Sequence, residues 1–185
     1  MSRLLSLLVL AVAAAAQQTH VKLDNNVTQV KFTVIDVLHT VHGTFKLTQG
    51  ELWFDQTSGK VGGTLVVDGA SGNSGSYARD SRMKKNILES GMYPEITFVP
   101  DRIEGKVNLS GRSEFDLHGM FAIHGAAHEV TMRVNADVEG GHLTATAAFD
   151  VPYVKWGLKN PSTLFLRVND VVPIEIDAVG EINGP

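Results

Sequence analysis

Histidine is the residue type with the most evident chemistry in this 185-residue sequence, which holds seven histidines and no cysteine. His39 and His42 are three residues apart, so on a continuous strand their side chains point to opposite faces. His118 and His124 share a face, but six residues at ~3.3 Å per residue place them ~20 Å apart. His124 and His128 can meet across a hairpin. Two ligands without a third rarely hold an ion, so the spacing favours no metal site.

Nucleophilic chemistry has one weak indication, the S-x-x-K pattern formed by Ser81 and Lys84. The companion patterns S-D-N and K-T-G are absent, and the chain is too short for the large helical part of penicillin-recognising enzymes. The pair is therefore interpreted as polar residues on the first turn of a surface helix. The G-x-S-x-G elbow, the P-loop and the dinucleotide fingerprint are also absent. The sequence predicts no catalytic residue and no cofactor.

The first sixteen residues have the pattern of a secretion signal, with Arg3, an apolar stretch and a small-residue site at Ala14-Ala15-Ala16. An apolar run of roughly 12 to 13 residues is shorter than the ~20 needed to span a bilayer, so cleavage is favoured over a membrane anchor. We expect the mature chain to begin at Gln17, to form one domain over residues 17–185, and to be periplasmic or secreted. A formal net charge of −4 argues against a nucleic acid partner.

Most of the chain after Thr19 alternates apolar with polar residues, as Val30, Phe32 and Val34 do, which is typical of strands with one buried face. Gln49-Gly50 is interpreted as a turn between two such segments. About eight strands are expected. The segments are residues 30–34, 45–47, 52–54, 61–67, 96–99, 115–123, 130–138, 143–151 and 171–179. This spacing predicts an all-β fold, either an antiparallel sandwich or a closed barrel.

Residues 80–90 break the alternation. Met83, Ile87 and Leu88 fall at helical spacing, with charged residues on the other side. Gly91 is suited to a left-handed C-terminal cap. A short helix is therefore expected here, across one barrel end or packed on its side.

Small residues on the predicted inner face suggest internal space. Ala145 and Ala147 share the buried side of one strand, and Gly119 and Ala122 lie in another. An eight-stranded barrel can fill its interior with side chains or hold one ligand, and small wall residues favour the ligand. The alternative is that neighbouring Phe and Met side chains fill the gap.

Several local patterns then occur in a fixed order along the chain. They are His42-Gly43-Thr44-Phe45 with residues 50–55, Arg79-Asp80 with Met83, residues 93–98 (P-x-I-x-F), residues 119–125 (G-x-x-x-I-x-G) and Lys155-Trp156-Gly157. Together they resemble the YceI-like family of lipocalin-fold polyisoprenoid-binding proteins. The chain departs from the family where Ala127-His128 replaces the usual Thr-Lys after the hairpin glycine.

The resemblance implies an extended, eight-stranded, lipocalin-like antiparallel barrel with one short helix, a long apolar tunnel, a periplasmic location and often a homodimer. It implies an isoprenoid lipid or a quinone-like ligand, and it does not imply catalysis. Alternation assigns to the tunnel wall Phe32, Phe45, Phe98, Phe121, Ala145, Ala147 and Phe149.

The expected mouth of this tunnel contains His39, Arg79 and Trp156. Imidazole and guanidinium groups suit a phosphate or a carbonyl, and an indole can cover an apolar tail. The alternative for these three residues is barrel-end packing and solvation. The leading hypothesis is thus a binding or carrier protein. The alternatives are an enzyme acting on a lipid or envelope substrate in the same cavity, and a structural stress protein with a filled barrel.

Overall fold

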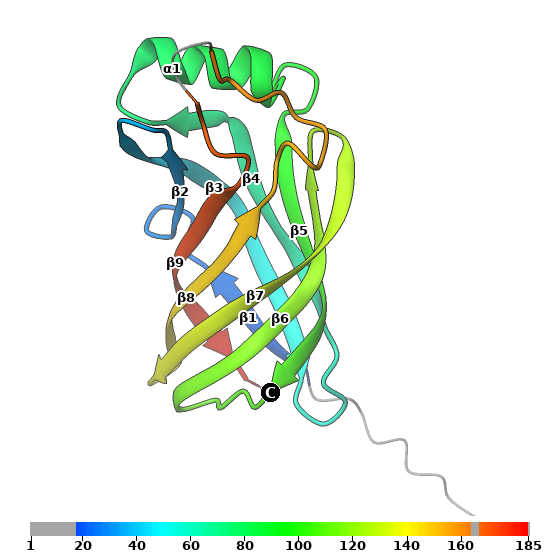
Figure 1. Ribbon diagram of the computed structural model, residues 1–185. Coiled ribbons are helices and arrows are strands. Elements are labelled where there is room, and N and C mark those ends of the chain that lie inside the picture. Colours follow the sequence, from blue (N-terminus) through cyan, green and yellow to red (C-terminus); the bar gives the residue numbers. More distant parts are fainter. Residues whose placement is uncertain (1–17, 164–166, 185) are drawn as a thin grey trace, which may run out of the picture.

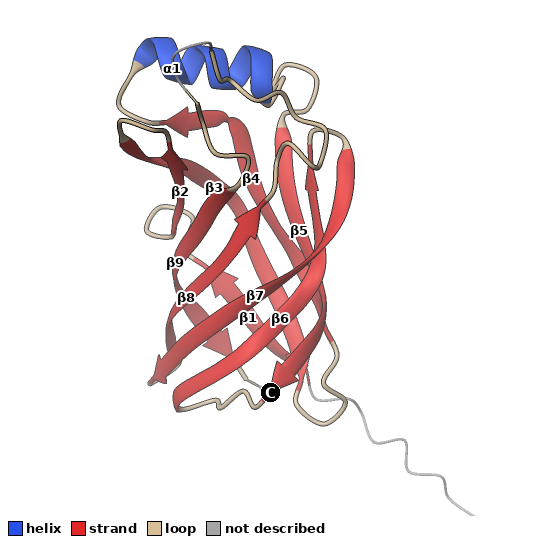
Figure 2. Cartoon of the chain, in the orientation of Figure 1, coloured by secondary structure: helices blue, strands red, loops and turns tan. Residues whose placement is uncertain are grey.

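The computed structural model describes residues 18–163 and 167–184. Within them, nine strands form one antiparallel sheet that closes on itself, as Figures 1 and 2 show. The strands are β1 (Gln18–Leu23), β2 (Gln29–Ile35), β3 (Thr40–Asp55), β4 (Val61–Asn73), β5 (Glu95–Gly105), β6 (Gly111–Ile123), β7 (Ala126–Glu139), β8 (His142–Val151) and β9 (Val172–Asn183).

The sheet of the described residues has eight positions around the barrel because β1 and β2 occupy one position, end to end. Each pairs with part of β3 on one side and part of β9 on the other. Thr28 bridges the break between them. Its hydroxyl donates to the carbonyl oxygen of Val179 (3.1 Å) and accepts from the Val179 N–H (3.2 Å), which replaces the missing ladder bonds. The expected eight-stranded antiparallel barrel is confirmed, and the sandwich alternative was wrong.

The predicted turn at Gln49-Gly50 was also wrong, because β3 runs without interruption from Thr40 to Asp55. A register shift between β3 and β4 lies between Leu47 and Gln49, so the strand bends instead of turning. Gly50 permits close packing here, since a Cβ atom on it would lie 2.7 Å from Cβ of Leu23. The glycine therefore marks an inter-strand contact and not a chain reversal.

A helical segment lies across one end of the barrel (Figure 2). It consists of α1 (Tyr77–Arg82) and a continuation of π-helical geometry, η1 (Met83–Ile87). Met83 and Ile87 are half-buried and pack against the core, so the predicted helix and its apolar face are confirmed, although the helix begins and ends three residues earlier than expected. Across residues 18–163 and 167–184, no helix is both long and apolar enough to cross a bilayer.

The predicted left-handed cap at Gly91 was wrong, because the left-handed residue is Glu89, with φ of 47°. The helix ends earlier than expected, so its terminal turn falls on Glu89. A non-glycine residue pays a steric cost in this conformation. The Glu89 carboxylate offsets it by binding two neighbours, His124 Nε2 at 3.0 Å and Lys159 Nζ at 2.9 Å. This carboxylate therefore ties the end of the helix to the barrel rim.

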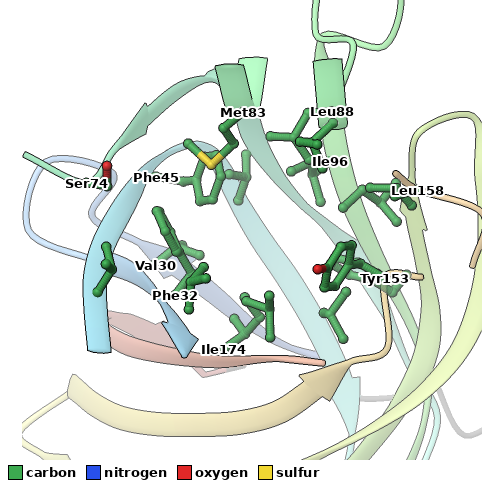
Figure 3. A pocket seen from close by; sticks show the side chains of 18 of the residues that line it. Val30, Phe32, Phe45, Ser74, Met83, Leu88, Ile96, Tyr153, Leu158 and Ile174 are labelled. Atoms are coloured by element: carbon green, nitrogen blue, oxygen red, sulfur yellow. The ribbon is translucent and has the colours of Figure 1, made fainter. Parts of the chain in front are cut away.

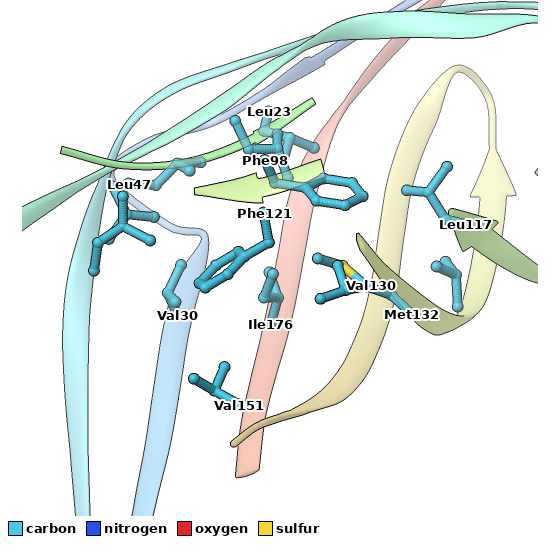
Figure 4. Packing of buried hydrophobic residues seen from close by; sticks show 14 of the residues in the cluster. Leu23, Val30, Leu47, Phe98, Leu117, Phe121, Val130, Met132, Val151 and Ile176 are labelled. Carbon is cyan, nitrogen blue, oxygen red and sulfur yellow. The ribbon is translucent and has the colours of Figure 1, made fainter. Parts of the chain in front are cut away.

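The barrel half remote from the helix is filled by side chains. Phe54, Phe115, Val134 and Leu143 are each less than a tenth exposed there. Met132 is 1% exposed and lies near the middle of the barrel, where Figure 4 shows it with other members of the same cluster. Packing of this kind stabilises the fold without disulfides, consistent with the absence of cysteine from the sequence.

Candidate ligand-binding cavity

The barrel half beneath the helix contains a cavity of about 460 Å³, drawn in Figure 3. That volume is within the range of sites that hold small organic ligands. All nine described strands contribute to its walls, although β1 contributes Leu23 alone and β7 contributes Met132 alone. Five phenylalanine rings lie on the walls: Phe32, Phe45, Phe98, Phe121 and Phe149.

The position of Phe32 shows how the strands shape this wall. Phe32 on β2 is opposite Gly43 on β3. A Cβ atom on Gly43 would lie 2.2 Å from Cζ of Phe32, so only a glycine leaves room for the ring at this point of the neighbouring strand. The ring then meets that of Phe45, with centroids 5.1 Å apart. Together the two rings form one apolar side of the cavity.

The helix closes the cavity from above. Met83, Ile87 and Leu88 point into it from the helical segment and the residue that follows. None of the residues of α1 and η1 is fully buried. A helix whose apolar side is only half-buried against a cavity is a cover, since a packed core would bury that side completely.

Polar groups on the cavity lining gather at the helix end of the barrel. They are the side chains of Asp36, Ser74, Arg79, Arg82 and Tyr153. Arg79 Nε and Nη2 donate to the hydroxyl and the carbonyl oxygen of Ser74, both at 2.7 Å. Arg82 Nη2 donates to the carbonyl oxygen of Pro161 at 3.1 Å. The cavity is thus apolar along its depth and positively charged at its mouth.

Each of two ionisable groups on this lining keeps a single protonation state around neutral pH. The pKa of Asp36 is lowered, chiefly by a hydrogen bond from the backbone N–H of Leu38, so its carboxyl group is charged at neutral pH. Burial raises the pKa of Tyr153 to about 12, and the nearby Asp170 adds to this. The Tyr153 hydroxyl donates to the carbonyl oxygen of Asn169 at 2.9 Å. Neither group is poised to exchange protons near neutral pH.

Comparison with known protein families identifies the family to which this barrel belongs. The model of the YceI-like domain matches residues 21–180, nearly the whole barrel. The chain belongs to the YceI-like family. No curated protein matches the sequence.

Solved structures share the YceI-like fold at low sequence identity. BcnA of Burkholderia cenocepacia has a TM-score of 0.71 and 19% identity, over 85% of this chain and 98% of BcnA. A polyisoprenoid-binding domain of Saccharophagus degradans, implicated in plant cell wall breakdown, has a TM-score of 0.64 and 15% identity, over 90% of this chain and 98% of that one. The YCEI protein of Campylobacter jejuni has a TM-score of 0.56 and 11% identity, over 97% and 93% of the two chains. These similarities establish the fold.

Six of the ten residues expected at the ligand site line the cavity of this YceI-like barrel: Phe32, Phe45, Phe98, Phe121, Phe149 and Arg79. The structure brings these together around one space, and contact with a ligand stays a prediction. The other four, His39, Ala145, Ala147 and Trp156, lie outside the lining.

Ala145 and Ala147 lie in the filled half of the barrel. Ala147 is opposite Val134 on β7, which is in turn opposite Phe115 on β6. Val134 and Phe115 are both buried, so large side chains from neighbouring strands take up the space that the small residues leave. Alternation correctly gave the inward face of these alanines but not their level along the barrel axis.

His39 and Trp156 lie at the helix end and do not line the cavity. The His39 side chain is 71% exposed, with its Nδ1 3.7 Å from Oδ1 of Asp36. Trp156 stacks on His128, with centroids 4.1 Å apart and an interplanar angle of 2°, and its ring lies 5.8 Å from that of Phe121. Nε2 of His128 is buried and has no hydrogen-bond partner among the described residues. The Trp156–His128 pair thus packs beside Phe121 and does not belong to the cavity lining.

Sequence reasoning missed several lining residues. Asp36, Ser74, Arg82, Tyr153 and Leu158 belong to turns, to the polar side of the helix or to the irregular segment after β8, where no periodic signal exists. The apolar helix face was the one usable clue, because an amphipathic helix at a barrel end must cover something apolar. Its cover function followed only from the position of the helix.

The histidine side chains do not cluster at one site. Among the described residues, no three or more His, Asp and Glu side chains are placed to hold a metal ion. Nδ1 of His118 lies 2.7 Å from Oδ1 of Asp101, and His42 Nδ1 lies 3.1 Å from the Thr33 hydroxyl. These are pairwise surface contacts.

Proposed function

We propose that this YceI-like protein holds a single lipid with an isoprenoid-type tail, polyprenyl or quinone-like, in the cavity under the helix. The observation that carries the proposal is that apolar and charged side chains occupy different parts of the cavity lining. Apolar side chains cover the depth of the cavity, while Arg79 and Arg82 lie at its mouth. An amphiphile with its tail inward and its head group at the rim matches that arrangement.

The energetics favour a long apolar tail. At ~0.8 kcal/mol per buried CH₂, each five-carbon isoprene unit gains up to roughly 3 to 4 kcal/mol on leaving water. A phosphate or carbonyl head group would accept hydrogen bonds from guanidinium N–H groups at the mouth. The polyisoprenoid-binding domain of Saccharophagus degradans, which has the same fold, supports this class of ligand.

Export fits the same proposal. Residues 1–16, which lie outside the described residues, have the sequence pattern of a cleavable secretion signal. A periplasmic or secreted carrier would move an insoluble lipid through water, which the lipid cannot cross alone. A homodimer, as the family resemblance implies, would present two such cavities.

The two alternatives fit the cavity less well. An enzyme would need an acid, a base or a nucleophile poised on the lining, whereas Asp36 stays charged and Tyr153 stays neutral around pH 7. A structural stress protein with a filled barrel would not contain about 460 Å³ of space beneath its helix.

Mass spectrometry of an organic extract tests the proposal directly. The protein is purified without detergent from a host rich in isoprenoids, and the extract is compared with that of a similarly expressed protein lacking a cavity. We expect one isoprenoid-type lipid per barrel. Recovery of no lipid, or of the same trace lipids from both proteins, would refute the carrier function.

A further inference from the structure

The mouth of the cavity is bordered by apolar side chains that project into solvent. Three of them, Ile35, Val37 and Leu38, belong to the tip between β2 and β3, and the fourth, Tyr77, begins α1. Their exposed fractions are 38%, 65%, 71% and 90%. We refer to these four residues as the lip. Figure 1 shows the β2–β3 tip and the start of α1 at the same edge of the barrel.

Hydrogen bonds to the backbone fix the conformation of the β2–β3 tip that carries most of the lip. Oδ1 of Asp36 accepts hydrogen bonds from the backbone N–H groups of Leu38 and His39, both at 2.8 Å, which fixes the turn. The tip is also joined to residues 167–169. Val37 donates its N–H to the carbonyl oxygen of Arg167 (3.3 Å), and Ile35 accepts from the N–H of Asn169 (3.0 Å). Val37 and Leu38 are therefore held outward by the backbone on both sides.

Val37 and Leu38 are unusual residues at such a tip, because turns between strands normally carry Gly, Asn, Asp, Ser or Pro. Single exposed apolar residues elsewhere on the barrel, such as Val99 and Leu109, need no explanation. Several gathered at one edge, next to a cavity, indicate a surface that meets an apolar partner.

Charge identifies the partner. Residues 77–87 carry four basic side chains and one acidic one, a formal charge of +3, within a chain whose net charge is −4. The basic residues are Arg79, Arg82, Lys84 and Lys85. The acidic residue, Asp80, is engaged by the backbone N–H and the hydroxyl of Ser74. The helical segment is thus positive within a chain that is acidic overall.

We infer that the lip and the helix form a docking surface for an anionic lipid bilayer. Apolar side chains that insert at the acyl boundary, flanked by Lys and Arg that meet anionic head groups, are the two elements of peripheral membrane binding. Arg79 and Asp36 line the cavity and lie beside the lip, so docking places the mouth of the cavity against the membrane.

This docking surface has a further consequence, which rests on the proposed function. A lipid could pass between bilayer and cavity without its tail crossing water. Docking itself does not need cargo, so it is testable on protein stripped of lipid.

Flotation with vesicles tests the docking. The purified protein is mixed with phosphatidylcholine vesicles, with and without phosphatidylglycerol, and the bound fraction is measured. We expect binding to the anionic vesicles that weakens as salt is raised. Leu38→Asp removes an apolar side chain from the lip and should lower partitioning about tenfold or more. Leu109→Asp is the matched control, because Leu109 lies in the loop between β5 and β6 at the opposite barrel end, and it should bind as the parent does.

The charge contribution is tested by the pair Lys84→Gln and Lys85→Gln, neither of which lines the cavity. At about 1 kcal/mol per lysine near an anionic surface, each change should lower partitioning about fivefold. Equal binding by Leu38→Asp and Leu109→Asp, or no binding to anionic vesicles, would overturn the inference.

A second copy of the chain is the competing occupant of the lip. Analytical ultracentrifugation without vesicles distinguishes it. A dimer that Leu38→Asp converts to a monomer would show that the lip is a protein interface and would overturn membrane docking. Mass spectrometry of bound lipid on the same variants keeps the two proposals apart, because loss of docking with retained lipid would refute the surface and leave the carrier function standing.

Discussion

Replacement of Ile174 by tryptophan should nearly abolish retention of a long apolar ligand. Ile174 lies on β9 between two aromatic wall residues, Phe32 on β2 and Phe149 on β8, and its side chain points into the cavity (Figure 3). An indole side chain has six more heavy atoms than that of isoleucine. It therefore takes up the space of about one five-carbon isoprene unit within a cavity of about 460 Å³.

The expected loss of affinity follows from the apolar surface of the ligand that can no longer be buried in the cavity. One isoprene unit returned to water costs roughly 3 to 4 kcal/mol, which corresponds to a rise in Kd of about 10²- to 10³-fold. Displacement of a fluorescent apolar probe measures the change in Kd, and mass spectrometry of the purified variant measures retained lipid. Circular dichroism and urea unfolding establish that the variant is folded.

Thr146→Trp is the matched control, because Thr146 lies on the exposed outer face of β8 and receives the same indole. It should bind lipid as the parent does. If Ile174→Trp does not fold, Val34→Phe adds four carbons at a half-buried position on the same lining and should give a smaller loss. A folded Ile174→Trp variant with unchanged affinity would refute the cavity as the binding site.

Three further expectations concern stability and processing. His128→Phe keeps an aromatic ring while removing the buried, unpartnered Nε2, and should raise the free energy of unfolding by roughly 1 kcal/mol in urea titrations; a decrease would mean that Nε2 has a hydrogen-bond partner in solution. Hydrogen bonds from Lys159 first and His124 second lower the pKa of Glu89, so its contribution to stability is present above the usual glutamate pKa and is lost as pH falls through the lowered value. Glu89→Gln should therefore be less stable than the parent near neutral pH, with a difference that shrinks in acid; a difference independent of pH would contradict the ion-pair account. Finally, N-terminal sequencing of protein recovered from the periplasm or medium should begin at Gln17, and an intact Met1 in a membrane fraction would favour the anchor instead.

Local residue order was sufficient for the fold of this chain. The alternation in Val30, Phe32 and Val34 and its recurrence gave strands, and the ordered motifs gave the closed YceI-like barrel that the structure has. Side-chain period is a local property of extended chain, so it survives without knowledge of the partners. The same holds for the helix, whose apolar face was evident from Met83 and Ile87.

The positions of the ligand space and its mouth depended on the tertiary structure. Alternation fixes which face a residue is on but carries no information about its height in the barrel. The sequence pattern therefore assigns Phe32 and Ala147 alike to the inner face. Phe32 lines the cavity, whereas Ala147 is opposite Val134, which is in turn opposite Phe115, in the filled half of the barrel. The grouping of Val37 and Leu38 with Tyr77, 39 residues further along the chain than Leu38, likewise required the barrel to close and the helix to lie across its end. Contacts between segments that are distant in sequence are decided by strand register, and register is set by the whole sheet at once.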